Sequence, residues 1–228
     1  MNYAQLTAAI EDYTENTFTA TELATFVQNA EQRIYNTIQF PALRKNVIGG
    51  LTAGNKYLAT PSDFLSVFSL AVITAGGDYN YLLDKDVNFI RESYPNSSTA
   101  TGVPQYYAIF GPTTTSVPPV TPTNELSLIL GPTPDSNYSV ELHYFYYPVS
   151  MSDTVNNPSG TSWLGDNFDS VLLYGSLLEA YVFMKGEPDL MAKYQERYNE
   201  ALGLAKQLGD GKNRQDAYRN GQVRYPVK

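Results

Sequence analysis

NFDSVLLYGSLLEAYVFMK, residues 167–185, decides the fold, because its apolar side chains cover too wide an arc for a helix with one face in water. We expect this stretch to form the most buried helix. Gly186-Glu187-Pro188 closes it, and Pro188–Leu208 then places apolar residues along one side of a second helix. The two helices are expected to pack as an antiparallel hairpin, with Gly209 and Gly211 ending the second.

The N-terminal part is expected to add two more helices. Tyr3–Tyr13 can form a short one, and Thr19 with Glu22 three residues later has the form of a capping box that opens a longer one. The longer helix carries an apolar stripe at helical spacing: Leu23, Phe26, Val27, Ala30, Ile34 and Ile38. Three polar residues are expected to stay outside this stripe: Gln28, Glu31 and Gln32.

Between these helical parts, from Asn46 to about Ser150, the pattern changes to short strands separated by turn residues. Leu65–Ile73 predicts a buried strand, Tyr106–Phe110 a second strand, and Asp86–Ser93 one or two helical turns. The proline-rich segment that contains Pro112, Pro118, Pro119 and Pro122 favours an extended loop.

The clearest pair of strands in this part is Glu125–Leu130 with Tyr138–Tyr147. A connection rich in turn formers, Gly-Pro-Thr-Pro-Asp-Ser-Asn, joins them. We therefore predict that these two strands form a β-hairpin.

These elements predict an α+β fold, in which N- and C-terminal helices form one bundle and an antiparallel β-rich domain is inserted between them. The expected parts are residues 1–45 (N-terminal helices), 46–160 (β-rich domain), 161–208 (helical hairpin) and 209–228 (extended basic tail). With 228 residues, 43% of them hydrophobic, the chain can build a sizeable core.

Charge separates the last part from the rest. Residues 209–228 carry five cationic and two acidic side chains, a net charge of +3, whereas the whole chain carries −8. An acidic body argues against general nucleic-acid binding, because phosphate binding needs clustered cations. The basic tail has few apolar residues and no hydrophobic period, so we expect a partner to order it.

The search for catalytic or metal-binding residues returns little. Cysteine is absent, and the one histidine, His143, lies in an aromatic strand where a structural role is expected. A calcium-loop pattern that begins at Asp84 lacks its glycine and its bidentate glutamate. A carboxylate hydrolase would have to use Asp166, Asp169 and Glu179, but no base or nucleophile accompanies them. We expect no enzyme activity, no cofactor and no metal.

Nineteen tyrosines suggest contact surfaces, since tyrosine is enriched at interfaces. Tyr144, Tyr146 and Tyr147 cannot all face one side of a strand, because side chains alternate. Either this strand is covered on both faces or one of these tyrosines meets a partner.

The order of parts resembles the head-to-tail adaptor (connector) proteins of tailed bacteriophages. The resemblance covers nearly the whole chain and rests on these stretches: Glu22-Leu23 to Ile34, Pro61-Ser62-Asp63-Phe64-Leu65, Gly102-Val103-Pro104-Gln105-Tyr106-Tyr107, Leu126 to Tyr147, and the helix Ser170 to Met184. None of these stretches is a catalytic motif, so the resemblance is one of architecture.

This resemblance implies a virion protein of the neck, made in the host cytoplasm, that forms a ring, usually of twelve copies. Such a ring lies between the portal protein and the tail tube or nozzle, and double-stranded DNA passes through it without specific binding. No membrane is involved. The resemblance also implies that the C-terminal tail docks on the portal, through Arg214, Tyr218, Arg219, Val223, Arg224, Tyr225, Pro226 and Val227. The ring or tail interface is expected at Tyr144, Tyr146 and Tyr147.

Another class remains open from the residues alone. The tyrosines and the Thr/Pro segment also suit a β-rich recognition module of a tail fibre or a carbohydrate-binding protein. That alternative leaves the long C-terminal helices unexplained.

Overall fold

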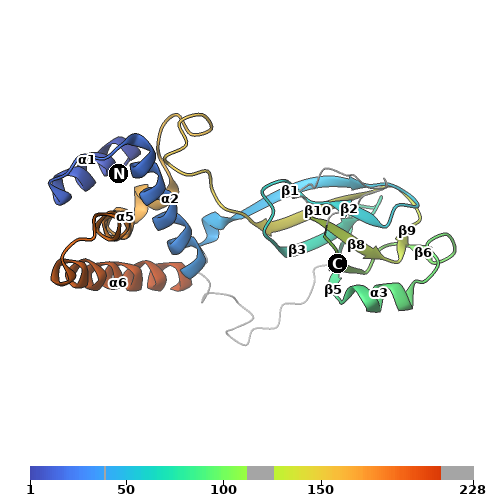
Figure 1. The fold of residues 1–228 in the computed structure, drawn as a ribbon. Helices are drawn as coiled ribbons and strands as arrows, with labels where there is room; N and C mark the ends of the chain where they lie inside the picture. The colour runs from blue at the N-terminus through green and yellow to red at the C-terminus, as the bar shows by residue number, and fades with distance from the viewer. Residues whose placement is uncertain (39, 112–125, 212–228) are drawn as a thin grey trace, which may run out of the picture. The chain divides into compact units, whose positions relative to one another are not determined.

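The computed structural model describes residues 1–38, 40–111 and 126–211 of the chain (Figure 1). It divides into two compact units. The helical unit consists of Met1–Leu43 and the described residues from Tyr147 onward, and the β-rich unit is Arg44–Tyr146. The α+β prediction, with a β-rich part inserted between N- and C-terminal helices, is confirmed.

The helical unit is built around α5 (Asp169–Met184), which contacts four other helices. These are α1 (Tyr3–Thr14), α2 (Ala20–Thr37), α4 (Trp163–Asn167) and α6 (Pro188–Gly211). Gly175 lets two of them approach α5 closely, because a Cβ there would lie 3.2 Å from the Tyr198 ring of α6 and 3.3 Å from the Ala30 Cβ of α2. The predicted central helix and its hairpin with α6 are therefore both present.

Local signals place the ends of these helices. The predicted capping box opens α2, with the Thr19 backbone N–H donating to Glu22 and the Glu22 N–H donating to the Thr19 hydroxyl. The predicted apolar stripe of α2 is buried throughout. The end predicted for α6 is wrong, because the helix continues through Gly209 to Gly211. Glycine inside a helix costs only about 1 kcal/mol relative to alanine, which α6 accommodates.

The β-rich unit contains two four-stranded sheets. The first has the order β1-β10-β3-β4, and the second has the order β2-β8-β7-β5. The strands of the first sheet are β1 (Arg44–Leu51), β3 (Ser66–Ile73), β4 (Tyr79–Tyr81) and β10 (Tyr138–Phe145). Those of the second are β2 (Tyr57–Ala59), β5 (Leu83–Asp84), β7 (Tyr106–Ile109) and β8 (Ser127–Gly131). Neighbouring strands are antiparallel except β5 and β7, which are parallel.

One apolar core joins the two sheets. Val140 and Leu142 of β10 pack in it together with Leu128 and Leu130 of β8. The other face of β8 is covered by α3 (Val87–Ser93), whose Ile90 packs with Ile129. A short parallel pair, β6 (Thr101–Gly102) and β9 (Thr133–Pro134), and a 3-10 turn at Pro41–Leu43 complete the described elements.

The predicted hairpin between Glu125–Leu130 and Tyr138–Tyr147 is wrong. β10 pairs with β1 and β3, whereas β8 pairs with β2 and β7 in the other sheet. Both strands bury a face in the same core, so the turn-rich connection carries the chain from one sheet to the other. The strand predicted at Leu65–Ile73, the Tyr106 strand and the short helix near Asp86 are present as β3, β7 and α3. The predicted burial of the first holds only for Leu70–Val72, because Leu65 and Phe68 are 44% and 50% exposed.

Candidate interaction sites

The predicted portal-docking residues lie outside the described residues, as does the proline-rich segment 112–125. The docking residues concerned are Arg214, Tyr218, Arg219, Val223, Arg224, Tyr225, Pro226 and Val227. Their role stays a prediction. The described chain ends with α6, at Gly211, in the helical unit.

The three tyrosines of the predicted interface have different surroundings. Tyr144 is only 3% exposed, and its hydroxyl donates a 2.8 Å hydrogen bond to Asp63 Oδ1. Lys45 Nζ lies 2.6 Å from the other carboxylate oxygen of Asp63. Burial, followed by the Asp63 carboxylate, raises the pKa of Tyr144 to about 12. Tyr144 is thus packed and paired inside the β-rich unit.

Tyr146 and Tyr147 are both partly exposed. The Lys45 ammonium lies 4.3 Å from the centre of the Tyr146 ring, in the β-rich unit. Tyr147 belongs to the helical unit, where it stacks on Tyr35 with ring centroids 6.4 Å apart and donates its hydroxyl proton to Asn36. These two rings keep surface that a partner can contact.

The first sheet of the β-rich unit carries large exposed apolar side chains on the face opposite the core. The strand register places Ile48 of β1, Ala71 of β3 and Tyr81 of β4 on the same side as Glu141 of β10, opposite the buried Leu142. Large apolar side chains on this unit are strongly exposed: Ile48 66%, Phe68 50%, Tyr79 50% and Tyr81 67%. Such a concentration of exposed apolar surface is typical of a protein interaction site.

The residues considered for catalysis have structural surroundings. His143 Nε2 lies 3.4 Å from Glu141, and its Nδ1 lies 3.3 Å from the Ser69 hydroxyl. Glu179 forms an ion pair with Arg33. Asp166 and Asp169 lie in the first turns of α4 and α5, where negative charge favours a helix N-terminus.

The described part of the chain also offers no metal cluster. Among the described residues, no three His, Cys, Asp or Glu side chains lie together in a way that could hold a metal ion. The rejected calcium-loop residue Asp86 instead caps α3, where it accepts a 2.7 Å hydrogen bond from the Asn88 N–H. No helix among the described residues is long and apolar enough to cross a membrane.

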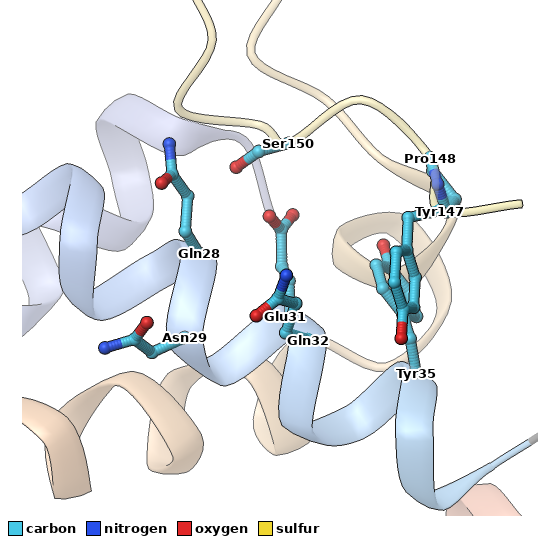
Figure 2. Close-up of a pocket in the computed structure, with 8 residues that line it drawn as sticks. All are labelled: Gln28, Asn29, Glu31, Gln32, Tyr35, Tyr147, Pro148 and Ser150. Carbon is cyan, nitrogen blue, oxygen red and sulfur yellow. The ribbon is translucent and has the colours of Figure 1, made fainter. Parts of the chain in front are cut away.

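The helical unit contains a pocket that the sequence did not predict. It has a volume of about 240 Å³, and its wall is formed by Gln28, Asn29, Glu31, Gln32, Tyr35, Tyr147, Pro148 and Ser150. Figure 2 shows Glu31 pointing from α2 toward Ser150, with Tyr35 and Tyr147 on one side of it. α2 and the segment that follows Tyr147 therefore build this pocket together.

Glu31 is the unexpected member of this pocket. It was predicted to lie outside the apolar stripe of α2, yet it is only 3% exposed. Its Oε1 accepts a 3.2 Å hydrogen bond from the Met151 N–H. Burial raises the pKa of Glu31 above its ordinary value, although hydrogen bonds from Ser150 and Met151 act against this. The local sequence held no sign of it, since the segment that buries Glu31 lies about 120 residues further along the chain.

Comparison with known proteins gives one finding. A family model described as SU10 adaptor protein matches residues 1–225 of the chain. No curated protein matches it.

Proposed function

The chain belongs to the SU10 adaptor protein family, whose members are structural adaptors of bacteriophages. From this family membership we propose that the protein forms a ring of twelve copies between the portal and the tail. As a phage adaptor it is a virion component of the head–tail junction. The ring would join the portal protein to the tail tube or nozzle and continue the channel through which DNA leaves the head.

The family match carries this proposal because of its extent. It covers residues 1–225, which include both units and all but the last three residues of the basic C-terminal part. The resemblance inferred from the sequence and the family match therefore agree along the chain.

The exposed outer face of the first sheet supports ring formation. Phe68, Tyr79 and Tyr81 each expose half or more of their surface, and a second copy or the next tail component would cover them. Tyr146 and Tyr147 are partly exposed and are proposed to belong to the same kind of interface. Tyr144 acts from inside the β-rich unit, by holding Asp63.

Charge supports the proposed roles of the tail and the channel. Residues 212–228 carry five cationic side chains and one acidic one, which suits docking on an acidic portal surface. The remainder of the chain is strongly acidic, and like charge lets DNA slide past without being bound.

Two measurements test the proposal. Native mass spectrometry of the protein, alone and mixed with portal, should show assemblies at multiples of 25.3 kDa, with twelve copies in the portal complex. Deleting residues 212–228 should leave both units folded and abolish co-sedimentation with portal particles.

A charge variant serves as the matched control for the deletion. Arg197→Gln removes an exposed arginine of α6, which pairs with Glu200, and should leave co-sedimentation intact. Undiminished co-sedimentation of the deleted chain would refute tail docking. A chain that stays monomeric with portal would refute the ring.

A further inference from the structure

The proposed function leaves the pocket around Glu31 without a role, although this pocket contains a buried carboxyl group. The Glu31 carboxylate is almost fully buried, and its hydrogen-bond donors, the Met151 N–H and the Ser150 hydroxyl, are both neutral. No ion pair among the described residues involves Glu31. A buried carboxylate is costly unless a cation accompanies it, so the pocket is suited to receive one.

The walls of the pocket favour a guanidinium group over an ammonium group. Tyr35 and Tyr147 stack with an angle of 26° between their rings, beside the Glu31 carboxylate (Figure 2). A planar guanidinium can stack on an aromatic surface while its fork of N–H groups donates to a carboxylate. Its remaining N–H groups can donate to side-chain amide oxygens, which Gln28, Asn29 and Gln32 supply around the rim.

The arginines of the described chain are already engaged. Arg33 pairs with Glu179, and Arg197 lies 3.3 Å from Glu200. The guanidinium of Arg44 lies 4.2 Å from the centre of the Phe68 ring, and that of Arg91 lies 4.9 Å from the centre of the Phe110 ring. The other three arginines, Arg214, Arg219 and Arg224, belong to residues 212–228.

The C-terminal segment can also reach the pocket. It begins after Gly211, the last residue of α6, in the same unit as Glu31. Its 17 residues can span up to about 60 Å when extended. A tethered ligand acts at an effective concentration on the order of millimolar, so even a weak site is occupied by the segment of its own chain.

We propose that an arginine of residues 212–228 inserts its guanidinium into the Glu31 pocket of its own chain, between the carboxylate and the Tyr35–Tyr147 pair. The pocket is then a guanidinium-binding site that holds the C-terminal segment on the helical unit. Docking of this segment on another protein requires the bound arginine to leave the pocket first.

Spin labels on the full-length chain test this proposal without any partner. The chain has no cysteine, so Thr25→Cys, on the exposed side of α2 near the pocket, takes one nitroxide. A second goes on Ala217→Cys or, in a separate sample, on Gln222→Cys. Double electron–electron resonance should show a narrow short-distance component, and the sample with the shorter distance shows whether the bound arginine lies nearer residue 217 or residue 222.

Charge variants then decide whether Glu31 causes this component. Glu31→Gln should lower the ratio of bound to released segment roughly tenfold, because a charge-assisted hydrogen bond becomes a neutral one. Glu196→Gln, which makes the same change at an exposed site on α6, should leave the ratio unchanged. Near-ultraviolet circular dichroism checks that both variants are folded, and replacing the three tail arginines by glutamine should abolish the component with the pocket intact.

Three results would overturn the proposal. One is the absence of a short-distance component in the wild-type background. Another is an equal component in the Glu31→Gln and Glu196→Gln variants. The third is a component that disappears on dilution with unlabelled chain, since that would mean that a second copy supplies the arginine. None of these outcomes depends on portal binding, so docking on the portal can fail or succeed separately.

Discussion

Asp63 in the β-rich unit and Glu31 in the helical unit are two carboxylates that receive hydrogen bonds, but among the described residues only Asp63 has a cation beside it. Burial acts to raise the pKa of Asp63, yet the hydrogen bonds from Lys45 and Tyr144 outweigh it and hold that pKa below its ordinary value. The pKa of Glu31 is displaced the other way, because burial there is opposed only by neutral donors.

This difference separates a completed site from an incomplete one. The β-rich unit contains all the groups that stabilise the Asp63 charge, and all of them lie within Arg44–Tyr146. The described helical unit holds a buried charge without its counterion. A buried charge without a counterion disfavours folding, so the proposed guanidinium would stabilise the helical unit by pairing with Glu31.

The largest expected effect is the loss of stability when a buried leucine is truncated in either unit. It shows whether the two units unfold independently of each other. Leu172→Ala in α5 and Leu142→Ala in β10 each truncate a buried leucine and should each cost about 2–5 kcal/mol. Because the two leucines lie in different units, each variant should weaken mainly its own unit. Hydrogen exchange in denaturant, read by mass spectrometry on peptides from α5 and β10, measures the two separately.

Leu204→Ala is the control for these truncations, since this leucine of α6 is 59% exposed and its loss should change stability by less than about 0.5 kcal/mol. Equal loss of protection in both units from either core variant would show that the chain unfolds as one body. Asp63 and Glu31 would then be two sites of a single cooperative unit.

A smaller effect concerns the completed site. Tyr144→Phe removes the hydroxyl that donates to Asp63 and should cost about 1 kcal/mol, since Lys45 remains and the site is partly exposed. Asp63 has a lowered folded-state pKa, so its contribution is present above its unfolded-state pKa of about 3.9 and is lost as the pH falls through the folded value. Urea unfolding of both proteins at pH 7 and at pH 3 measures this difference.

Tyr146→Phe makes the same chemical change in the same unit, at a hydroxyl without a hydrogen bond among the described residues, and should be nearly neutral. A cost for Tyr144→Phe that is equally large at pH 3 and pH 7 would contradict the assignment to Asp63. The Tyr144 hydroxyl would then stabilise the β-rich unit independently of the charge on Asp63.

The helical unit shows which features a sequence can predict. The capping box at Thr19 and the apolar stripe of α2 depend on residues three or four apart, so they were readable locally. The burial of Glu31 depends on Met151 and Ser150, which only the folded chain brings to α2. A polar residue next to an apolar stripe gives no sign of this, and the pocket was missed for that reason.

The β-rich unit shows the same limit in strand pairing. The strands near Tyr106 and Tyr138 were recognised, because alternation and turn residues mark a strand within a few positions. Their partners were not, since β10 pairs with β1, about 95 residues away along the chain. Turn-rich sequence between two strands predicts a hairpin, but here the chain crosses to the facing sheet, because both strands bury a face in one core.

The smallest expected effect is a shift in the pKa of Glu31, and it tests directly whether Glu31 has a cation beside it as Asp63 has. In a chain with Arg214, Arg219 and Arg224 replaced by glutamine, Glu31 should titrate above the ordinary glutamate value of about 4.3, as its burial predicts. In the wild-type chain a bound guanidinium should lower this pKa toward the range of Asp63, because a nearby cation favours the charged form. Carbon-13 NMR of the glutamate side-chain carboxyl groups measures both values.

The sign of the linked stability follows from the raised pKa. In the arginine-free chain the folded state binds the Glu31 proton more tightly than the unfolded state, so stability rises as the pH falls through the folded pKa toward the unfolded one. That rise should be absent from the same chain carrying Glu31→Gln, and it should be reduced in the wild type, where the guanidinium offsets the charge. Identical Glu31 titrations with and without the three arginines would show that no guanidinium of the C-terminal segment pairs with Glu31. The proposed pairing would then be wrong.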